Sequence, residues 1–336
     1  MNTLLEVRDL RTVFDTYAGE VKAVNGVSFS LQAGEAMAVV GESGCGKSVT
    51  ALSIMRLLAS NGRVAGGQIL LDGRDLSRVT GREMRSIRGN EIGIIFQDPM
   101  TSLNPVLTIG TQIAEGLELH QGLKRREATQ RAIEMLRVVG IPNPERRIRQ
   151  YPHEFSGGMR QRVMVAIALA CNPKLLIADE PTTALDVTIQ AQILELMKDL
   201  KRRFNMAIIL ITHDLGVVAG LASRVLVMYA GKIIEQGPVK AIYRNPQHPY
   251  TWGLLRSIPR LDAREKKRLV NILGTPPDLL SPPLGCPFYP RCEHALKVCE
   301  TNMPETTEVT GGHLVACWLQ HPMAPRVARR EGSVGA

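Results

Sequence analysis

The chain has 336 residues, of which 44% are hydrophobic and 22% charged, and its formal net charge at pH 7 is +9. These values are ordinary for a globular protein and exclude a disordered or fibrous chain. The positive charge suits a polyanionic partner, whether ATP, a nucleic acid or a phospholipid surface, and does not choose among them.

The N-terminus does not have the pattern of a signal peptide, because Glu6, Arg8 and Asp9 stand where an apolar region would be needed. No apolar run approaches the length of a membrane span. We therefore expect a protein of the cytosol. In that compartment the six cysteines are expected to be metal ligands or free thiols rather than disulfides.

The N-terminal part predicts two strands, at residues 4–8 and 23–31, joined by a loop that contains Phe14, Tyr17 and Gly19. A base ring gains about 1–3 kcal/mol by stacking on an aromatic side chain. Either Phe14 or Tyr17 therefore suits an adenine, and a place in the core is an equally good interpretation.

Residues 41–48, Gly-Glu-Ser-Gly-Cys-Gly-Lys-Ser, match the phosphate-loop pattern G-x-x-x-x-G-K-[ST] at every required position. An apolar run of strand length, residues 36–40, precedes them, and a helical pattern from Val49 to Leu58 follows. The glycines let several N–H groups converge on phosphate oxygens, while Lys47 supplies positive charge and Ser48 a hydroxyl ligand for Mg²⁺. This stretch predicts a nucleotide site.

The middle of the chain predicts further strands at residues 68–71 and 92–96, the second of which runs into Gln97. A helical period follows from Thr108 to Gly140 and indicates a helical insertion in an α/β domain. Ser156, Gly157 and Gly158 then open a helix that extends to about Cys171, with Ser156 as its N-cap and two glycines that leave N–H groups for an anion.

Polar side chains follow two later strands of the predicted sheet. Asp179 and Glu180 end the apolar run 175–178, and His213 comes shortly after the apolar run 207–211. Ligands of open α/β sheets lie at the carboxyl ends of the strands, so we expect these side chains to face the nucleotide. Asp179 is suited to Mg²⁺, Glu180 to the general base for the attacking water, and His213 to a γ-phosphate hydrogen bond.

In this order and spacing, the phosphate loop, Gln97, Ser156-Gly157-Gly158, Asp179-Glu180, Ala184-Leu185-Asp186 and His213 resemble an ABC-transporter ATPase over residues 4 to 255. The resemblance implies an α/β fold: a P-loop, RecA-like core with an antiparallel β subdomain and a helical subdomain. It implies an ATPase domain at 1–256, with its helical insertion at about 100–160. A narrower resemblance is to the ATPase subunits of dipeptide, oligopeptide and nickel importers. It is carried by residues 97–105, by residues 179–188 and by the C-terminal stretch that begins near His248.

The resemblance assigns roles to individual residues. It assigns ATP binding to Phe14, Gly41, Ser43, Gly44, Cys45, Gly46, Lys47, Ser48 and Val49. It assigns Mg²⁺ binding to Ser48, Gln97 and Asp179. It assigns catalysis to Gln97, Glu180 and His213. It implies that Ser156, Gly157 and Gly158, the signature stretch, serve the ATP of a second ATPase subunit in a head-to-tail pair, although Met159 stands where glutamine is commonest.

The partners implied by the resemblance are a second ATPase subunit, for which the family favours a paralogue, and two membrane-spanning permease subunits. An extracytoplasmic binding protein would act indirectly. The chain would then be peripheral on the cytoplasmic face of the membrane, with its basic helical insertion toward the permease. Nucleic-acid-directed ABC ATPases are the rival class, but one phosphate loop and the absence of long heptads between Ser48 and Ser156 argue against it. We expect no nucleic acid.

Beyond about Arg256 the chain is rich in proline and predicts a separate small module at 257–336 with four cysteines. Cys286, Cys292, Cys299 and Cys317 are separated by five, six and seventeen residues. Four thiolates suit Zn²⁺ or an iron–sulfur cluster, and zinc favours closer pairs than these. The spacing and the family resemblance favour [4Fe-4S], with zinc and plain reduced thiols as the alternatives.

Overall fold

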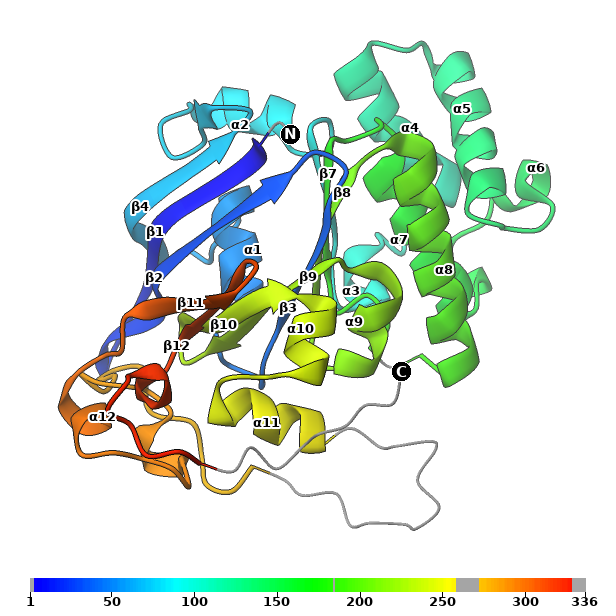
Figure 1. The fold of residues 1–336 in the computed structure, drawn as a ribbon. Helices are drawn as coiled ribbons and strands as arrows, with labels where there is room; N and C mark the ends of the chain where they lie inside the picture. Colours follow the sequence, from blue (N-terminus) through cyan, green and yellow to red (C-terminus); the bar gives the residue numbers. More distant parts are fainter. Residues whose placement is uncertain (1–2, 184, 258–271, 328–336) are drawn as a thin grey trace, which may run out of the picture. The chain divides into compact units, whose positions relative to one another are not determined.

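The computed structural model, drawn as a ribbon in Figure 1, describes residues 3–183, 185–257 and 272–327. These residues belong to two compact units. Unit 1 comprises Met1–Leu4, Leu31–Ala36 and Leu71–Ile211, and unit 2 comprises Leu5–Ser30, Met37–Leu70 and Thr212–Ala336. A strand that crosses a boundary is grouped with the unit that holds most of its residues.

Three parallel strands form the sheet of unit 1, namely β6 (Ile92–Ile95), β7 (Leu175–Asp179) and β8 (Ala207–Thr212). β7 pairs with β6 on one side and with β8 on the other, and Asp179 lies opposite Ile211. Every residue of β7 and β8 is buried, which explains the uninterrupted apolar runs in the sequence. Asp179 therefore ends a central strand.

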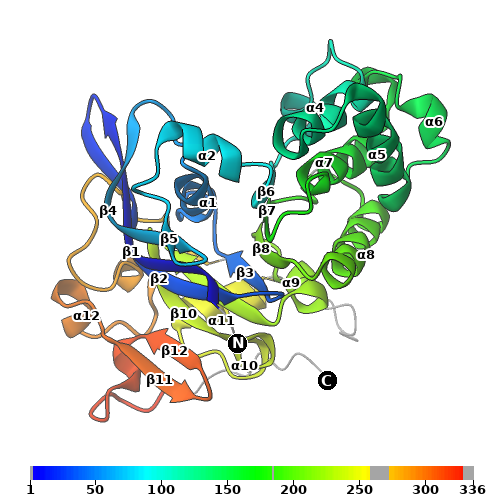
Figure 2. The same cartoon turned by 90° about the horizontal axis from the view of Figure 1, so that it is seen from above.

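In unit 1, α7 (Gly157–Leu169) contacts α3 (Pro99–Ser102), α4 (Ile109–Gln121), α5 (Arg125–Val138) and β6. Figure 2 shows α4 and α5 beside α7. The helical period predicted from Thr108 is confirmed, but as two helices. They are separated at Gly122, whose φ of 65° ends α4 in the left-handed region. The other elements of unit 1 are β5 (Arg74–Asp75), α2 (Gly81–Ile87), α6 (Pro144–Arg147), the 3₁₀ turn Pro152–Glu154 and α8 (Val187–Phe204).

Unit 2 contains one sheet in which β2 (Gly19–Gln32), β1 (Thr3–Thr16) and β4 (Gly62–Leu71) lie side by side in that order. β1 and β2 are longer than the sequence predicted, because their alternating burial continues to a tight turn. The Thr16 hydroxyl closes that turn by donating to the carbonyl of Gly19 at 2.7 Å. The prediction that Phe14 lies in a loop is therefore wrong: Phe14 belongs to β1.

The second sheet of unit 2 is built around β9 (Arg224–Tyr229), which pairs in parallel with β3 (Ala36–Val40) and antiparallel with β10 (Lys232–Pro238). The chain's C-terminal part, residues 272–327, is called the tail below. Its strand β12 (His313–Ala316) pairs with β10, and β11 (Thr306–Thr310) pairs with β12. The tail therefore extends this sheet.

The helices of unit 2 are short. They are α1 (Lys47–Met55), α9 (Leu215–Leu221), α10 (Val239–Arg244), α11 (Pro249–Arg256) and α12 (Val298–Thr301), with 3₁₀ turns at Tyr289–Arg291 and Trp318–Gln320. Among the described residues, no helix of either unit is long and apolar enough to span a membrane.

Aromatic rings join the tail to the rest of unit 2. The Phe288 ring lies 5.3 Å from that of Tyr229 on β9 and 5.4 Å from that of Tyr250 on α11, and the last two are 4.6 Å apart. All three side chains and Cys286 belong to one buried cluster. The described tail is thus part of unit 2, and the structure does not support the separate Cys-rich module. Residues 258–271, next to the predicted domain boundary at 256, lie outside the described residues, so that boundary remains a prediction.

A buried carboxylate reinforces this junction. Glu235 on β10 accepts hydrogen bonds from the backbone N–H of Gln247 (2.6 Å) and of His248 (2.9 Å), and His313 of β12 places Nε2 2.7 Å from it. His248 also caps α11, since its Nδ1 accepts from the N–H of Tyr250 at 3.1 Å. One side chain thus connects β10, the start of α11 and the tail.

We expect this junction to weaken in mild acid. Burial lowers the pKa of His248 to about 4, partly opposed by the charge of Glu235. The unfolded chain has an ordinary histidine pKa of about 6.5, so it takes up the proton first as the pH falls from 6.5 towards 4. Between pH 7.5 and 5.5 this group should lower the free energy of unfolding by about 1.4 kcal/mol, measurable by urea denaturation.

The matched variant is His248→Asn, which keeps a side-chain cap for α11 and cannot titrate in this range. Its loss of stability between the two pH values should be smaller than that of the wild type by this amount. Equal losses in the two proteins would contradict the assignment.

Candidate functional site

The phosphate loop joins β3 to α1 through a turn that only glycine accommodates. Gly41 and Gly46 have φ values of 154° and 102°. A Cβ atom at Gly41 would lie 2.2 Å from the carbonyl oxygen of Met228, and one at Gly46 would lie 2.5 Å from that of Ala23. Gly44 also has a positive φ, of 76°, but no atom lies within 4 Å of its Cβ position. The loop backbone therefore packs directly against its neighbours at both ends.

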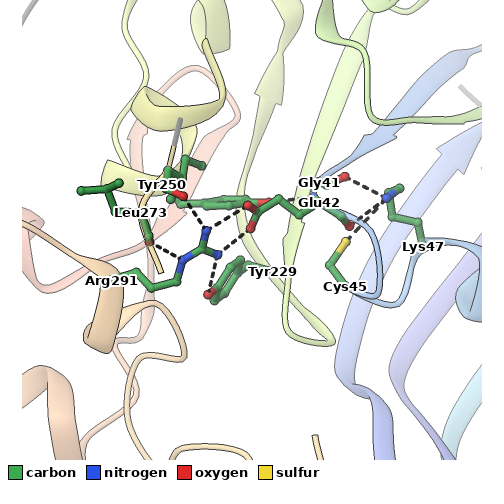
Figure 3. A network of polar contacts seen from close by, with 9 residues as sticks. Gly41, Glu42, Cys45, Lys47, Tyr229, Tyr250, Leu273 and Arg291 are labelled. Atoms are coloured by element: carbon green, nitrogen blue, oxygen red, sulfur yellow. Dashed lines mark hydrogen bonds and ion pairs between the residues drawn. The ribbon is translucent and has the colours of Figure 1, made fainter. Parts of the chain in front are cut away.

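Lys47 begins α1 and is buried. Its Nζ donates to the carbonyl oxygens of Gly41 (2.8 Å) and Glu42 (3.0 Å), as Figure 3 shows. The ammonium group thus lies over the loop, where a phosphate would exchange for these carbonyl contacts. Ser48 and Val49 follow in the first turn of α1. Cys45 is buried within the loop, and burial raises the pKa of its thiol.

The two candidates for stacking on adenine differ in exposure. Phe14 is half-buried in β1, and its ring lies so close to Gly62 that a Cβ there would approach Cε1 to 2.5 Å. Tyr17 lies in the turn after β1 and is fully exposed. The adenine contact remains a prediction.

Within unit 1 the structure brings Gln97 and Glu180 together. Gln97 Nε2 donates to Glu180 Oε2 at 3.0 Å, and the Thr183 hydroxyl donates to the same oxygen at 3.0 Å. Glu180 directly follows Asp179, which is buried at the end of β7. A carboxylate is thus held by two donors where a central strand ends. The contact of Thr183 is not predicted by any pattern in the sequence.

Glu180 has a φ of 47°, in the left-handed region that side chains other than glycine seldom adopt. Its N–H donates to the carbonyl of Ile211 on β8 at 2.9 Å, and its carbonyl accepts from the N–H of Thr183 at 3.2 Å. These bonds stabilise a backbone conformation that costs about 1–3 kcal/mol. The turn directs the chain abruptly away from β7.

The signature stretch begins α7. Ser156 is the N-cap and accepts from the N–H of Met159 at 3.4 Å, as predicted. Ser156 and Gly157 are exposed. A Cβ atom at Gly158 would lie 2.9 Å from the Ile189 side chain of α8, so a larger residue here would require that side chain to shift.

The remaining predicted positions lie near helix starts. Asp186 caps α8 by accepting from the N–H of Ile189 at 2.9 Å. Ala184 lies outside the described residues. His213, in unit 2, is an exposed residue between β8 and α9.

The four tail cysteines are neighbours in the structure. Burial, together with a smaller contribution from repulsion by other cysteine thiolates, raises the pKa of Cys286 to about 11 and that of Cys317 to about 12. Backbone N–H groups also donate to the sulfurs. Those of Phe288, His294, Leu296 and Leu319 face Cys286, Cys292, Cys299 and Cys317 respectively.

Such N–H groups suit sulfurs that carry negative charge on a metal or cluster. The described residues nevertheless contain no group of three or more His, Cys, Asp or Glu side chains in the arrangement of a metal site. The donor types and their surroundings fit a thiolate-bound group, whereas the present positions of the sulfurs do not form a closed site.

Two residues near the phosphate loop carry no signal in the sequence. The hydroxyl of Tyr250 accepts from the N–H of Glu42 at 2.8 Å, and Arg291 of the tail forms an ion pair with the Glu42 carboxylate (Figure 3). Both residues are more than 200 positions from the loop in the chain.

Comparison with known proteins agrees with this geometry. The family model described as ABC transporter matches residues 24–183, and the model described as the C-terminal region of oligopeptide/dipeptide transporters matches residues 234–299. The oligopeptide transport ATP-binding protein of Bacillus subtilis is 57% identical over 325 residues, which cover 96% of this chain and 91% of that protein. The chain belongs to the ATP-binding subunits of the oligopeptide and dipeptide ABC transporters.

Other members of the family are similarly close. The dipeptide transport ATP-binding protein of Bacillus subtilis is 56% identical over 96% of this chain and 97% of its own length. Among solved structures, the dimeric ATP-binding cassette MJ0796 bound to ADP and Pi covers 70% of this chain and 99% of its own, with 26% identity and a TM-score of 0.64. The α/β cassette fold and an ATP-hydrolysing transport subunit are thereby established.

We expect Gly46→Ala to disrupt the phosphate loop of this ATPase. The new methyl group would meet the Ala23 carbonyl at 2.5 Å and also strain a φ of 102°. Clash and strain together should lower the free energy of unfolding by about 2–5 kcal/mol. ATP binding should be lost, as equilibrium binding and thermal denaturation would show.

Gly44→Ala is the matched control, because it strains a φ of 76° without a neighbour to clash with. It should cost only about 1–2 kcal/mol. Equal effects of the two substitutions would mean that close packing at Gly46 is unimportant.

Proposed function

We propose that this chain hydrolyses ATP to drive the uptake of oligopeptides or dipeptides through membrane-spanning permease subunits. The single observation that carries the proposal is likeness over nearly the whole chain to proteins named as oligopeptide and dipeptide transport ATP-binding proteins, at 53–57% identity. The subunit would act at the cytoplasmic face of the membrane.

The chemistry assigned to unit 1 centres on Glu180. Its carboxylate would accept a proton from the attacking water, and the bonds from Gln97 and Thr183 hold it in one orientation. Because phosphoryl transfer needs mainly positioning and charge stabilisation, a rigidly held base suits this reaction. Asp179 and Gln97 would supply oxygen ligands for Mg²⁺.

The chemistry assigned to unit 2 centres on the phosphate loop. Its N–H groups and Lys47 would bind phosphate oxygens, and the Ser48 hydroxyl would bind Mg²⁺. The hydroxyl, amide and carboxylate oxygens of Ser48, Gln97 and Asp179 are the hard donors that Mg²⁺ prefers, and the ion would offset phosphate charge. His213 would contact the γ-phosphate, and Phe14 the adenine.

The proposed partners follow from the signature stretch. Ser156 and Gly157 are exposed at the N-terminus of α7, where N–H groups suit an anion. They would contact the ATP of a second ATPase subunit, for which we favour a paralogue. Two permease subunits complete the transporter, and a binding protein outside the membrane would deliver the peptide. Nickel or another solute is the alternative cargo, and a nucleic-acid-directed ATPase the alternative class.

We expect Glu180→Gln to lower ATP turnover by about 10²–10⁴-fold while ATP still binds, because the amide cannot accept the water's proton. Uptake of a labelled dipeptide in membrane vesicles that contain the assembled transporter should fall with it. Steady-state ATPase and uptake assays measure both.

Glu195→Gln makes the same chemical change on the exposed face of α8, where Glu195 pairs only loosely with Lys198 at 3.4 Å. It should leave both rates unchanged. Normal turnover in Glu180→Gln would refute the assignment of Glu180 as the general base. ATP turnover without peptide uptake, but with uptake of nickel or stimulation by DNA, would favour an alternative.

We also propose that Cys286, Cys292, Cys299 and Cys317 bind a [4Fe-4S] cluster. The thiols are close enough to repel one another as thiolates, and N–H groups face the sulfurs. The cluster would be structural or regulatory rather than redox-catalytic, because no electron donor or acceptor motif accompanies the four cysteines. Its binding would require the sulfurs to move into ligand positions.

Protein purified without oxygen should contain about four iron and four acid-labile sulfide atoms per chain, as the proposed cluster type requires. Cys292→Ser should lower the iron content, because it removes a ligand. Cys171→Ser is the control, since Cys171 is buried in unit 1, and it should keep the iron. Zinc in place of iron, or colourless metal-free protein, would refute the cluster.

A further inference from the structure

Arg291 connects the tail to the phosphate loop within unit 2. Its Nη1 donates to Glu42 Oε2 at 2.6 Å and its Nη2 to Glu42 Oε1 at 3.0 Å (Figure 3). The pair is bidentate, and the Arg291 side chain is only 3% exposed. Glu42 is the second residue of the loop, directly after Gly41. A charged pair of this geometry is strong and directional.

The remaining donors of Arg291 are also used. Nε donates to the carbonyl of Leu273 at 2.9 Å, Nη2 to that of Ile272 at 3.2 Å, and Nη1 to the Tyr229 hydroxyl at 3.1 Å. The guanidinium carbon lies 5.8 Å from the centre of the Tyr229 ring and 5.9 Å from that of Phe288. These contacts, in addition to the ion pair with Glu42, hold the buried guanidinium in one position.

Glu42 is held through its backbone as well. Its N–H donates to the Tyr250 hydroxyl at 2.8 Å, and its carbonyl accepts from Lys47 Nζ at 3.0 Å. Arg291 therefore binds the side chain of Glu42, and the peptide groups of the same residue contact Tyr250 and Lys47. Movement of this side chain would be transmitted to the loop backbone.

We propose that Arg291 is a positioning residue for ATP binding, which holds Glu42 in place and neutralises its charge beside the loop that receives the phosphates. Without Arg291, a carboxylate in the loop would repel the negative triphosphate and would be free to draw Lys47 away from it. The Arg291 guanidinium, which is not itself part of the phosphate loop, therefore determines the charge beside the phosphates and the position of the loop backbone. This role rests on ATP binding at the loop, not on peptide transport or on a cluster at the cysteines.

The test measures the dissociation constant for ATP on the full-length subunit by equilibrium binding, together with thermal denaturation without nucleotide. Arg291→Gln should weaken ATP binding about tenfold, within the range of couplings between contacting residues. In the double variant Arg291→Gln/Glu42→Gln the unpaired negative charge is gone, and most of the affinity should return. Arg291→Lys keeps the charge without the bidentate contact and should fall between the wild type and Arg291→Gln.

His313→Gln is the control for loss of tail packing, because it alters the contact with Glu235 and does not touch Glu42. It should lower the melting temperature without changing ATP affinity. The proposal is overturned if Arg291→Gln binds ATP normally, if His313→Gln weakens binding as much, or if the double variant binds no better than Arg291→Gln. If Arg291→Gln does not fold, Arg291→Lys and Glu42→Gln carry the comparison.

The outcome is separable from that of the proposed function. Wild-type protein that binds ATP but supports no peptide uptake would refute the transport proposal and leave the role of Arg291 standing. Wild-type protein that does not bind ATP would refute both.

Discussion

Glycine at positions 41 and 46 determines the path of the chain around the phosphate loop. At Gly41 and Gly46 the backbone lies against the carbonyl oxygens of Met228 and Ala23 at distances that leave no room for a Cβ atom. β3 can therefore turn at once into α1, and Lys47 at the start of that helix points back over the loop. Glycine at these two positions permits the loop conformation in which N–H groups can converge on an anion.

The tail depends on the same region. It extends the sheet through β12, contributes Phe288 to the buried rings, and binds Glu235 through His313 and Glu42 through Arg291. Two of these four connections involve buried charge, which is costly to leave unpaired. The tail is consequently part of the folded unit that contains the phosphate loop, and not an appendage held by its cysteines alone.

Unit 1 follows a comparable plan around Glu180. A left-handed backbone conformation turns the chain at the end of β7, and hydrogen bonds to Ile211 and Thr183 compensate for its cost. Gln97, which follows the neighbouring strand β6, reaches the carboxylate because β6 and β7 are parallel and end at the same edge. Strand order therefore brings together an amide and a carboxylate that are 83 residues apart.

The sequence by itself determined the phosphate loop, the central strands, the N-cap at Ser156, and the family, because each depends on residues close together in the chain. The short β1 and the loop position of Phe14 were wrong, since pairing with neighbouring strands extends β1 beyond its own pattern. Thr183 was missed because its role arises from the turn at Glu180. Only the tertiary structure showed that the tail joins unit 2. The contact between Arg291 and Glu42 joins positions 249 residues apart, and no local pattern of residues can specify a partner at that distance.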